Sequence, residues 1–194
     1  EGFRWSASGE NVLRNSSAAA AGEQCRHRVY RVGENGVDCF FRDDGLSDLI
    51  GFKYSEWHAE DAVANLVHHL ENIAAACDNC RDCAVVIILD GENAWEYYPE
   101  NGYYFLDALY RELGRHPGLE LGTFSGFLDA CQPQRAQLGS LTAGSWVYGT
   151  LSTWIGAPDK NRGWEMLADA KREYDRVLAA GRLAPEIAER ALMQ

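Results

Sequence analysis

Two carboxylates, Asp90 and Glu92, follow an unbroken apolar run at residues 84–89 in the stretch AVVIILDGENAWEYY. Three aromatic residues come within the six positions after Glu92. A simple turn needs glycine and one Asp or Asn, so the second acid and the rings need another explanation. Asp90 could cap a following helix. Alternatively, large rings could desolvate this carboxyl and raise its pKa towards the range of a general acid. The aromatic and acidic surroundings favour the second interpretation.

A second acidic cluster lies at residues 42–48, in the stretch RDDGLSD. This pattern is typical of a helix N-terminus, where Asp44 or Ser47 would be the cap and acidic residues would favour the helix dipole. Arg42 could form a buried ion pair with Asp43. We predict structural roles for Arg42, Asp44 and Asp48, and we keep Asp43 as a candidate for substrate binding.

The chain has six tryptophans, whose flat rings can either pack in a core or stack on sugar rings. Trp95, Trp146 and Trp154 lie in acidic or glycine-rich stretches, which favours stacking on a sugar. Trp164 falls on a terminal amphipathic helix and is expected in the core. Of the histidines, His58 is a marginal candidate for a site.

The hydrophobic periodicity predicts the elements that must position these residues. Apolar residues at helical spacing predict a long amphipathic helix over 55–77, and the continuous apolar run 84–89 predicts a buried strand. Alternation of strands and helices indicates parallel α/β architecture, in which active residues gather at the carboxyl ends of strands. The other expected elements are strands at 3–8, 27–32 and 37–43, the last two joined as a hairpin, and helices at 11–14, 101–115 and from 163 to the end.

Composition limits the partners. A chain of 194 residues that is 46% hydrophobic can bury a sizeable core and is predicted to be one domain. Its net charge of -11, without a basic stripe, argues against binding to nucleic acid or to an anionic membrane surface. The run 84–89 is too short to span a membrane. A neutral ligand such as a sugar is compatible with this charge.

Three cysteines stand close together at Cys77, Cys80 and Cys83, in the stretch CDNCRDC. Two overlapping C-x-x-C steps can signal zinc or an iron–sulfur cluster, either of which needs a fourth ligand. No other cysteine is near in sequence, so we favour reduced thiols in a cytoplasmic protein. No metal and no cofactor are predicted.

Three long stretches resemble glycoside hydrolase family 57, in its α-amylase-like and α-mannosidase-like branch. They are FFRDDGLSDLIGFKY, VIILDGENAWEYYPENGYYFLDALYREL and GSWVYGTLSTWIGAPDKNRGWEML. The resemblance implies a retaining, α-glucan-active enzyme on an incomplete (β/α)7 barrel that uses two carboxylates and no metal. It implies that Asp90 is the general acid/base and Glu92 an auxiliary acid. It also implies that Trp146 and Trp154 line the sugar cleft.

The sequence departs from the family pattern upstream. The nucleophile motif and a histidine-bearing first motif of the family are not found before the stretch GFRWSAS. We therefore expect residues 1–194 to be the later part of a catalytic barrel, inactive alone, from a hydrolase or glucanotransferase. Two alternatives stay open: a related barrel with α-mannosidase or polysaccharide deacetylase chemistry, and a catalytically idle carbohydrate-binding module.

Overall fold

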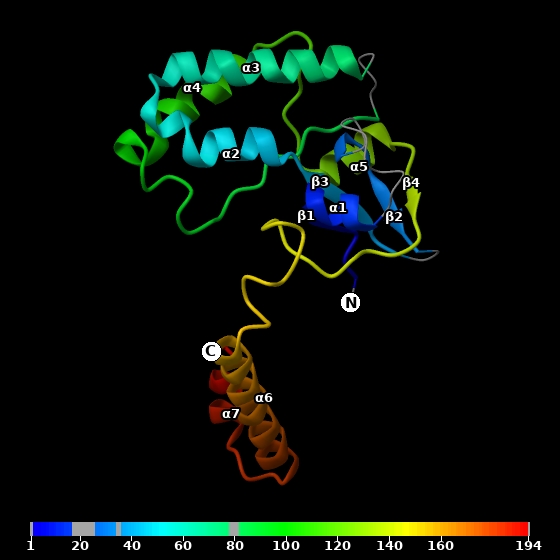
Figure 1. Cartoon of the computed structure of the whole chain (residues 1–194), viewed down its shortest axis with the longest axis vertical. Helices are drawn as coiled ribbons and strands as arrows, with labels where there is room; N and C mark the ends of the chain where they lie inside the picture. The colour runs from blue at the N-terminus through cyan, green and yellow to red at the C-terminus, as the bar shows by residue number, and fades with distance from the viewer. Residues whose placement is uncertain (1, 17–25, 34–35, 78–81, 194) are drawn as a thin grey trace. The chain divides into compact units, whose positions relative to one another are not determined.

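The chain forms two compact units, residues 1–150 and 151–194 (Figure 1). The computed structural model describes residues 2–16, 26–33, 36–77 and 82–193. All the strands that it describes belong to the first unit, and the second unit is helical. No helix of the described residues is long and apolar enough to cross a bilayer.

A four-stranded sheet with the order β1-β3-β2-β4 organises the first unit. β1 and β3 are parallel, as are β2 and β4, whereas β2 and β3 are antiparallel. The predicted α/β class and the hairpin are confirmed, but the sheet is mixed. A hairpin forces this reversal, because parallel neighbours need a much longer crossover. The strands are β1 (Trp5–Gly9), β2 (Tyr30–Val32), β3 (Asp38–Arg42) and β4 (Ala136–Leu138).

Strand β3 is central, and all five of its residues are buried. Since successive side chains alternate between faces, Cys39 and Phe41 pack on one side with Leu13 of α1 (Glu10–Ser16). Phe40 packs on the other side with Leu128 of α5 (Phe124–Cys131). Helices α1 and α5 therefore cover opposite faces of the sheet.

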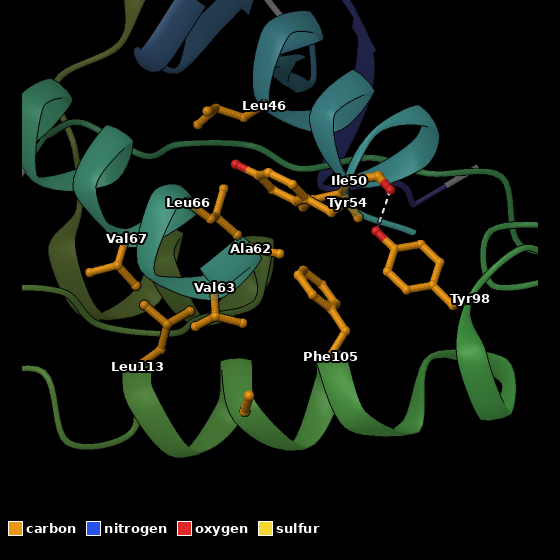
Figure 2. Packing of buried hydrophobic residues seen from close by; sticks show 11 residues of the cluster. Leu46, Ile50, Tyr54, Ala62, Val63, Leu66, Val67, Tyr98, Phe105 and Leu113 are labelled. Atoms are coloured by element: carbon orange, nitrogen blue, oxygen red, sulfur yellow. Dashed lines mark hydrogen bonds between the residues drawn. The ribbon is translucent and has the colours of Figure 1, made fainter. Parts of the chain in front are cut away.

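Three helices build a separate apolar core: α2 (Asp44–Phe52), α3 (Ala59–Ala76) and α4 (Tyr103–Leu113). The predicted stripe on α3 is confirmed, since Ala62, Val63 and Leu66 are buried. Phe105 of α4 packs into the same cluster, and the hydroxyl of Tyr98 donates a hydrogen bond of 2.5 Å to the carbonyl of Ile50 (Figure 2). Short 3-10 helices η3 (Tyr54–Glu56) and η4 (Pro99–Gly102) precede α3 and α4.

The predicted strand at 84–89 is wrong: this stretch has no regular secondary structure and belongs to no described sheet. Its backbone is held by scattered partners. Ala84 N–H donates to the His27 carbonyl at 2.8 Å, and the Val86 carbonyl accepts from Asp43 N–H at 2.8 Å. The Ser47 hydroxyl accepts from Ile88 N–H at 3.3 Å. We call residues 84–90 the anchored segment.

The second unit contains α6 (Pro158–Ala179) and α7 (Pro185–Leu192). The Tyr174 hydroxyl on α6 donates to the Ala188 carbonyl on α7 at 3.2 Å. No residue of α6 is buried, and Trp164 is 50% exposed, so its predicted core position is wrong. Its indole N–H donates to the Trp154 carbonyl at 2.9 Å.

Candidate functional site

The carboxyl ends of the parallel strands β1 and β3 lie side by side, with Gly9 opposite Arg42. Each strand passes at once into a helix: α1 begins at Glu10, and α2 is capped by Asp43. The residues that follow two adjacent parallel strands lie at the same edge of the sheet. In α/β folds functional groups gather at this edge, beyond the carboxyl ends of the strands. The acidic residues after both strands therefore meet.

Asp43 lies at the centre of this edge and is only 2% exposed. One carboxylate oxygen caps α2 by accepting from Leu46 N–H at 2.9 Å. The other accepts from Arg26 Nε at 2.9 Å and lies 2.9 Å from His27 Nε2. Burial works to raise the pKa of Asp43, but the hydrogen bonds of His27 and Leu46 and the charge of Arg26 outweigh it and lower the pKa to about 2. Both oxygens are thus engaged, and direct substrate binding by Asp43 stays a prediction.

Arg42 joins four segments of the first unit. Its Nε donates to the Ile88 carbonyl at 2.9 Å. Its two terminal nitrogens donate to Asp44 and Asp48 at 2.7 Å each. Its guanidinium lies 5.2 Å from the centroid of the Trp146 ring, within cation–π range. Arg42 has the structural role that we predicted, but its ion-pair partners are Asp44 and Asp48.

Glu10 completes this network, although the sequence analysis did not select it. Its carboxylate is paired with Arg14 at 2.6 Å and accepts from the backbone N–H of Asp44 at 3.2 Å. Burial, together with the neighbouring charges of Glu10 and Asp48, raises the pKa of Asp44 against the opposing effect of Arg42. Glu10 follows a strand directly, as Asp90 follows an apolar run, and the same rule could have found it.

Asp90 is the last residue of the anchored segment, Glu92 follows it by two positions, and both are exposed. The ring pocket that we expected around Asp90 is not found in the described part of the chain. Trp95 and Tyr98 pack instead on Phe105, with ring centroids 6.1 and 5.3 Å from it. The Ile88 carbonyl accepts a hydrogen bond from Arg42, and Asp90 comes two residues later. The backbone is therefore held at a point no more than about 7 Å from Asp90.

The two remaining predicted sugar contacts fall in different units. Trp146 is 40% exposed and covers the end of β1, where a Cβ on Gly9 would come within 2.7 Å of its Cα. The structure therefore brings Trp146 to the edge that carries Arg42. Trp154 belongs to the second unit and is 41% exposed. Its role in a sugar site stays a prediction.

Among the described residues, no group of three His, Cys, Asp or Glu side chains is arranged to hold a metal ion. Cys80 of the cysteine triplet lies outside the described residues. The strand ends present carboxylates, guanidinium groups and one partly exposed indole ring. Such groups transfer protons, orient hydroxyl groups and stack on apolar ring faces.

Residues 1–139 match the family model of glycosyl hydrolase family 57. The chain belongs to glycosyl hydrolase family 57. The match includes Asp43, Asp90, Glu92 and Trp95, whereas Trp146 and Trp154 follow it. No curated protein matches the chain. Membership of family 57 makes carbohydrate the substrate class and relates the chain to enzymes that cleave glycosidic bonds.

Proposed function

We propose that this family 57 chain supplies the acid/base part of a retaining, α-glucan-active glycoside hydrolase or glucanotransferase. The observation that supports it best is the position of Asp90. It is an exposed carboxyl within the matched residues, at the end of a segment that Arg42 ties to the ends of β1 and β3. A proton donor needs both accessibility to substrate and a fixed backbone.

In the proposed reaction, Asp90 protonates the oxygen of the leaving sugar while a second carboxylate attacks the anomeric carbon. The glycosidic bond breaks as the covalent glycosyl–enzyme bond forms. Asp90, now deprotonated, takes a proton from water or from an acceptor hydroxyl, whose oxygen displaces the enzyme carboxylate. A retaining site places the two carboxyl groups about 5–5.5 Å apart.

We assign the nucleophile to a part of the protein outside these residues, so the 194-residue chain alone is expected to give no turnover. Glu92 is proposed as an auxiliary acid that acts on the sugar near Asp90. Trp146 is proposed as a stacking surface, since its ring is partly exposed while Arg42 holds it in place.

The test uses the full-length protein that contains this chain, assayed on starch and on an aryl α-glucoside with a good leaving group. Asp90→Asn should lower the rate on starch by roughly 10²- to 10⁴-fold, which is the usual contribution of general acid catalysis. Formation of the glycosyl–enzyme from the aryl glycoside should be affected much less, because that leaving group needs no proton.

Glu96→Gln is the matched control, since Glu96 is another exposed acid of the same loop. It should leave both rates unchanged. Equal losses on the two substrates would contradict the proton-donor role. An inactive wild-type protein that still binds maltooligosaccharides would favour an idle binding module instead.

A further inference from the structure

A hollow separate from the proposed catalytic residues lies over the helical core of the first unit. Its volume is about 270 Å³, and it opens between η3, the start of α3 and the first turns of α4. Neither Asp90 nor Glu92 is among the residues that line it. Small-ligand sites typically have volumes of a few hundred Å³ and combine apolar walls with a few polar groups.

Aromatic carbon forms the floor of this hollow. Tyr54, Tyr98 and Phe105 are buried and lie close together there (Figure 2). The hydroxyl of Tyr54 donates to Asn65 Oδ1 at 2.7 Å, and that of Tyr98 donates to the Ile50 carbonyl. Since both hydroxyls are already bonded, these tyrosines offer mainly ring carbon to a ligand.

Two further rings on the wall remain accessible to solvent. Trp57 is 46% exposed, and its ring meets Tyr54 edge-on at 5.4 Å between centroids. Tyr104, on the first turn of α4, is 56% exposed. Exposed rings beside a hollow provide flat apolar faces on which a ligand can stack.

The rim carries polar groups of both signs. Asp107 and Arg111 form an i,i+4 ion pair at 2.8 Å, and Glu60, which also lines the hollow, is exposed. Carboxylate and guanidinium groups together can accept from and donate to hydroxyl groups. The three charges sum to −1, which disfavours an anionic ligand and requires no cationic one.

We propose that this hollow is an auxiliary binding site for one or two neutral pyranose units of a carbohydrate. The apolar face of the sugar stacks on Trp57 and Tyr104, and its hydroxyl groups bond to Glu60, Asp107 and Arg111. The family supplies the ligand class, because its members act on carbohydrate. The site does not depend on Asp90 being catalytic.

The test is titration of the purified chain with maltotriose and mannotriose, followed by saturation-transfer NMR and calorimetry. One of the two trisaccharides should bind in the millimolar range. Trp57→Ala and Tyr104→Ala should each weaken this binding by roughly tenfold or more, since each removes one stacking face. Circular dichroism should show that both variants remain folded, because the replaced rings are largely exposed.

Tyr110→Ala is the matched control, since Tyr110 is 60% exposed on the same helix but does not line the hollow. Its affinity should equal that of the wild-type chain. The proposal is overturned if neither trisaccharide binds saturably, if all three variants behave alike, or if Asp90→Asn abolishes binding. Binding of choline but of neither sugar would also overturn it, because aromatic hollows can hold quaternary ammonium groups.

The experiments distinguish failure of the auxiliary-site proposal from failure of the proposed function. Loss of auxiliary binding leaves the Asp90→Asn result on starch unaffected. Conversely, an inactive full-length protein could still bind a trisaccharide through Trp57 and Tyr104.

Discussion

Replacing Asp43 by asparagine removes one buried charge while leaving a residue that caps helices equally well. The cap bond to Leu46 N–H can therefore persist. The amide NH2 then replaces the oxygen that accepts from Arg26, so the change removes the charge together with that acceptor. In the folded chain the pKa of Asp43 is about 2, against an ordinary value of 3.8. A pKa lowered by folding stabilises the folded state above the unfolded pKa, and this contribution is lost as the pH falls through the folded pKa.

The fall in the pKa of Asp43 from 3.8 to about 2 corresponds to about 2.4 kcal/mol, to order of magnitude. Asp43→Asn should therefore lower the free energy of unfolding by roughly 2 to 3 kcal/mol at pH 7. The part of the difference that comes from ionisation should shrink below about pH 4 and nearly vanish near pH 2, where the wild-type carboxylate is itself becoming protonated.

Urea unfolding between pH 7 and pH 2 measures this, with NMR signals from β3 and α2 reporting on the first unit. Asp129→Asn is the matched control: its carboxylate bonds to Arg4 at 2.5 Å, but both side chains are exposed, so solvent screens the pair. The control should follow the wild-type curve closely. A gap for Asp43→Asn that is as wide at pH 2 as at pH 7 would refute the electrostatic argument.

Three further changes test other parts of the first unit. Phe105→Ala should destabilise it by about 3–5 kcal/mol in urea unfolding, because the ring is 2% exposed and leaves a cavity. Gly102→Ala should lower the free energy of unfolding by on the order of 1–3 kcal/mol, since φ is +83° and a Cβ would come within 2.9 Å of the Trp95 ring. Gly91→Ala is its control and should be tolerated, because a Cβ there meets nothing within 4 Å. Arg42→Lys should speed amide hydrogen exchange in the anchored segment, because an ammonium group cannot bond to the Ile88 carbonyl and two carboxylates in the same fork; unchanged exchange would contradict its positioning role.

The sequence predicted those elements whose burial depends on their own periodicity. The stripe on α3 is local information, and the helix lies where the stripe predicts it. The apolar run at 84–89 was ambiguous in a different way. The apolar composition of such a run indicates that it packs against other parts of the chain. It does not indicate whether another strand pairs with it. Here the bonds go to His27, Asp43, Ser47 and Arg42, and no regular ladder forms within the described part of the chain.

The candidate site was predictable where it follows directly from strand ends, as for Arg42 and Asp43. Trp95 shows the limit. Its acidic surroundings in the sequence favoured stacking on a sugar, yet the chain turns back at Pro99–Gly102 and lays that ring against Phe105. The sequence analysis did not select His27, which is 3% exposed and pairs with Asp43, sixteen residues away in sequence. Contacts of this kind depend on how segments meet, which spacing alone does not encode.

The four contacts of Arg42 also have an evolutionary consequence. One guanidinium contacts Asp44, Asp48, the Ile88 carbonyl and Trp146. Because the partner is shared, loss of one of these contacts changes how much each of the others contributes to stability. Residues that share one partner show non-additive effects in double-mutant cycles. Substitutions at this edge of the sheet should therefore be accepted in coordinated sets, and the order in which they arise should decide which of them survive.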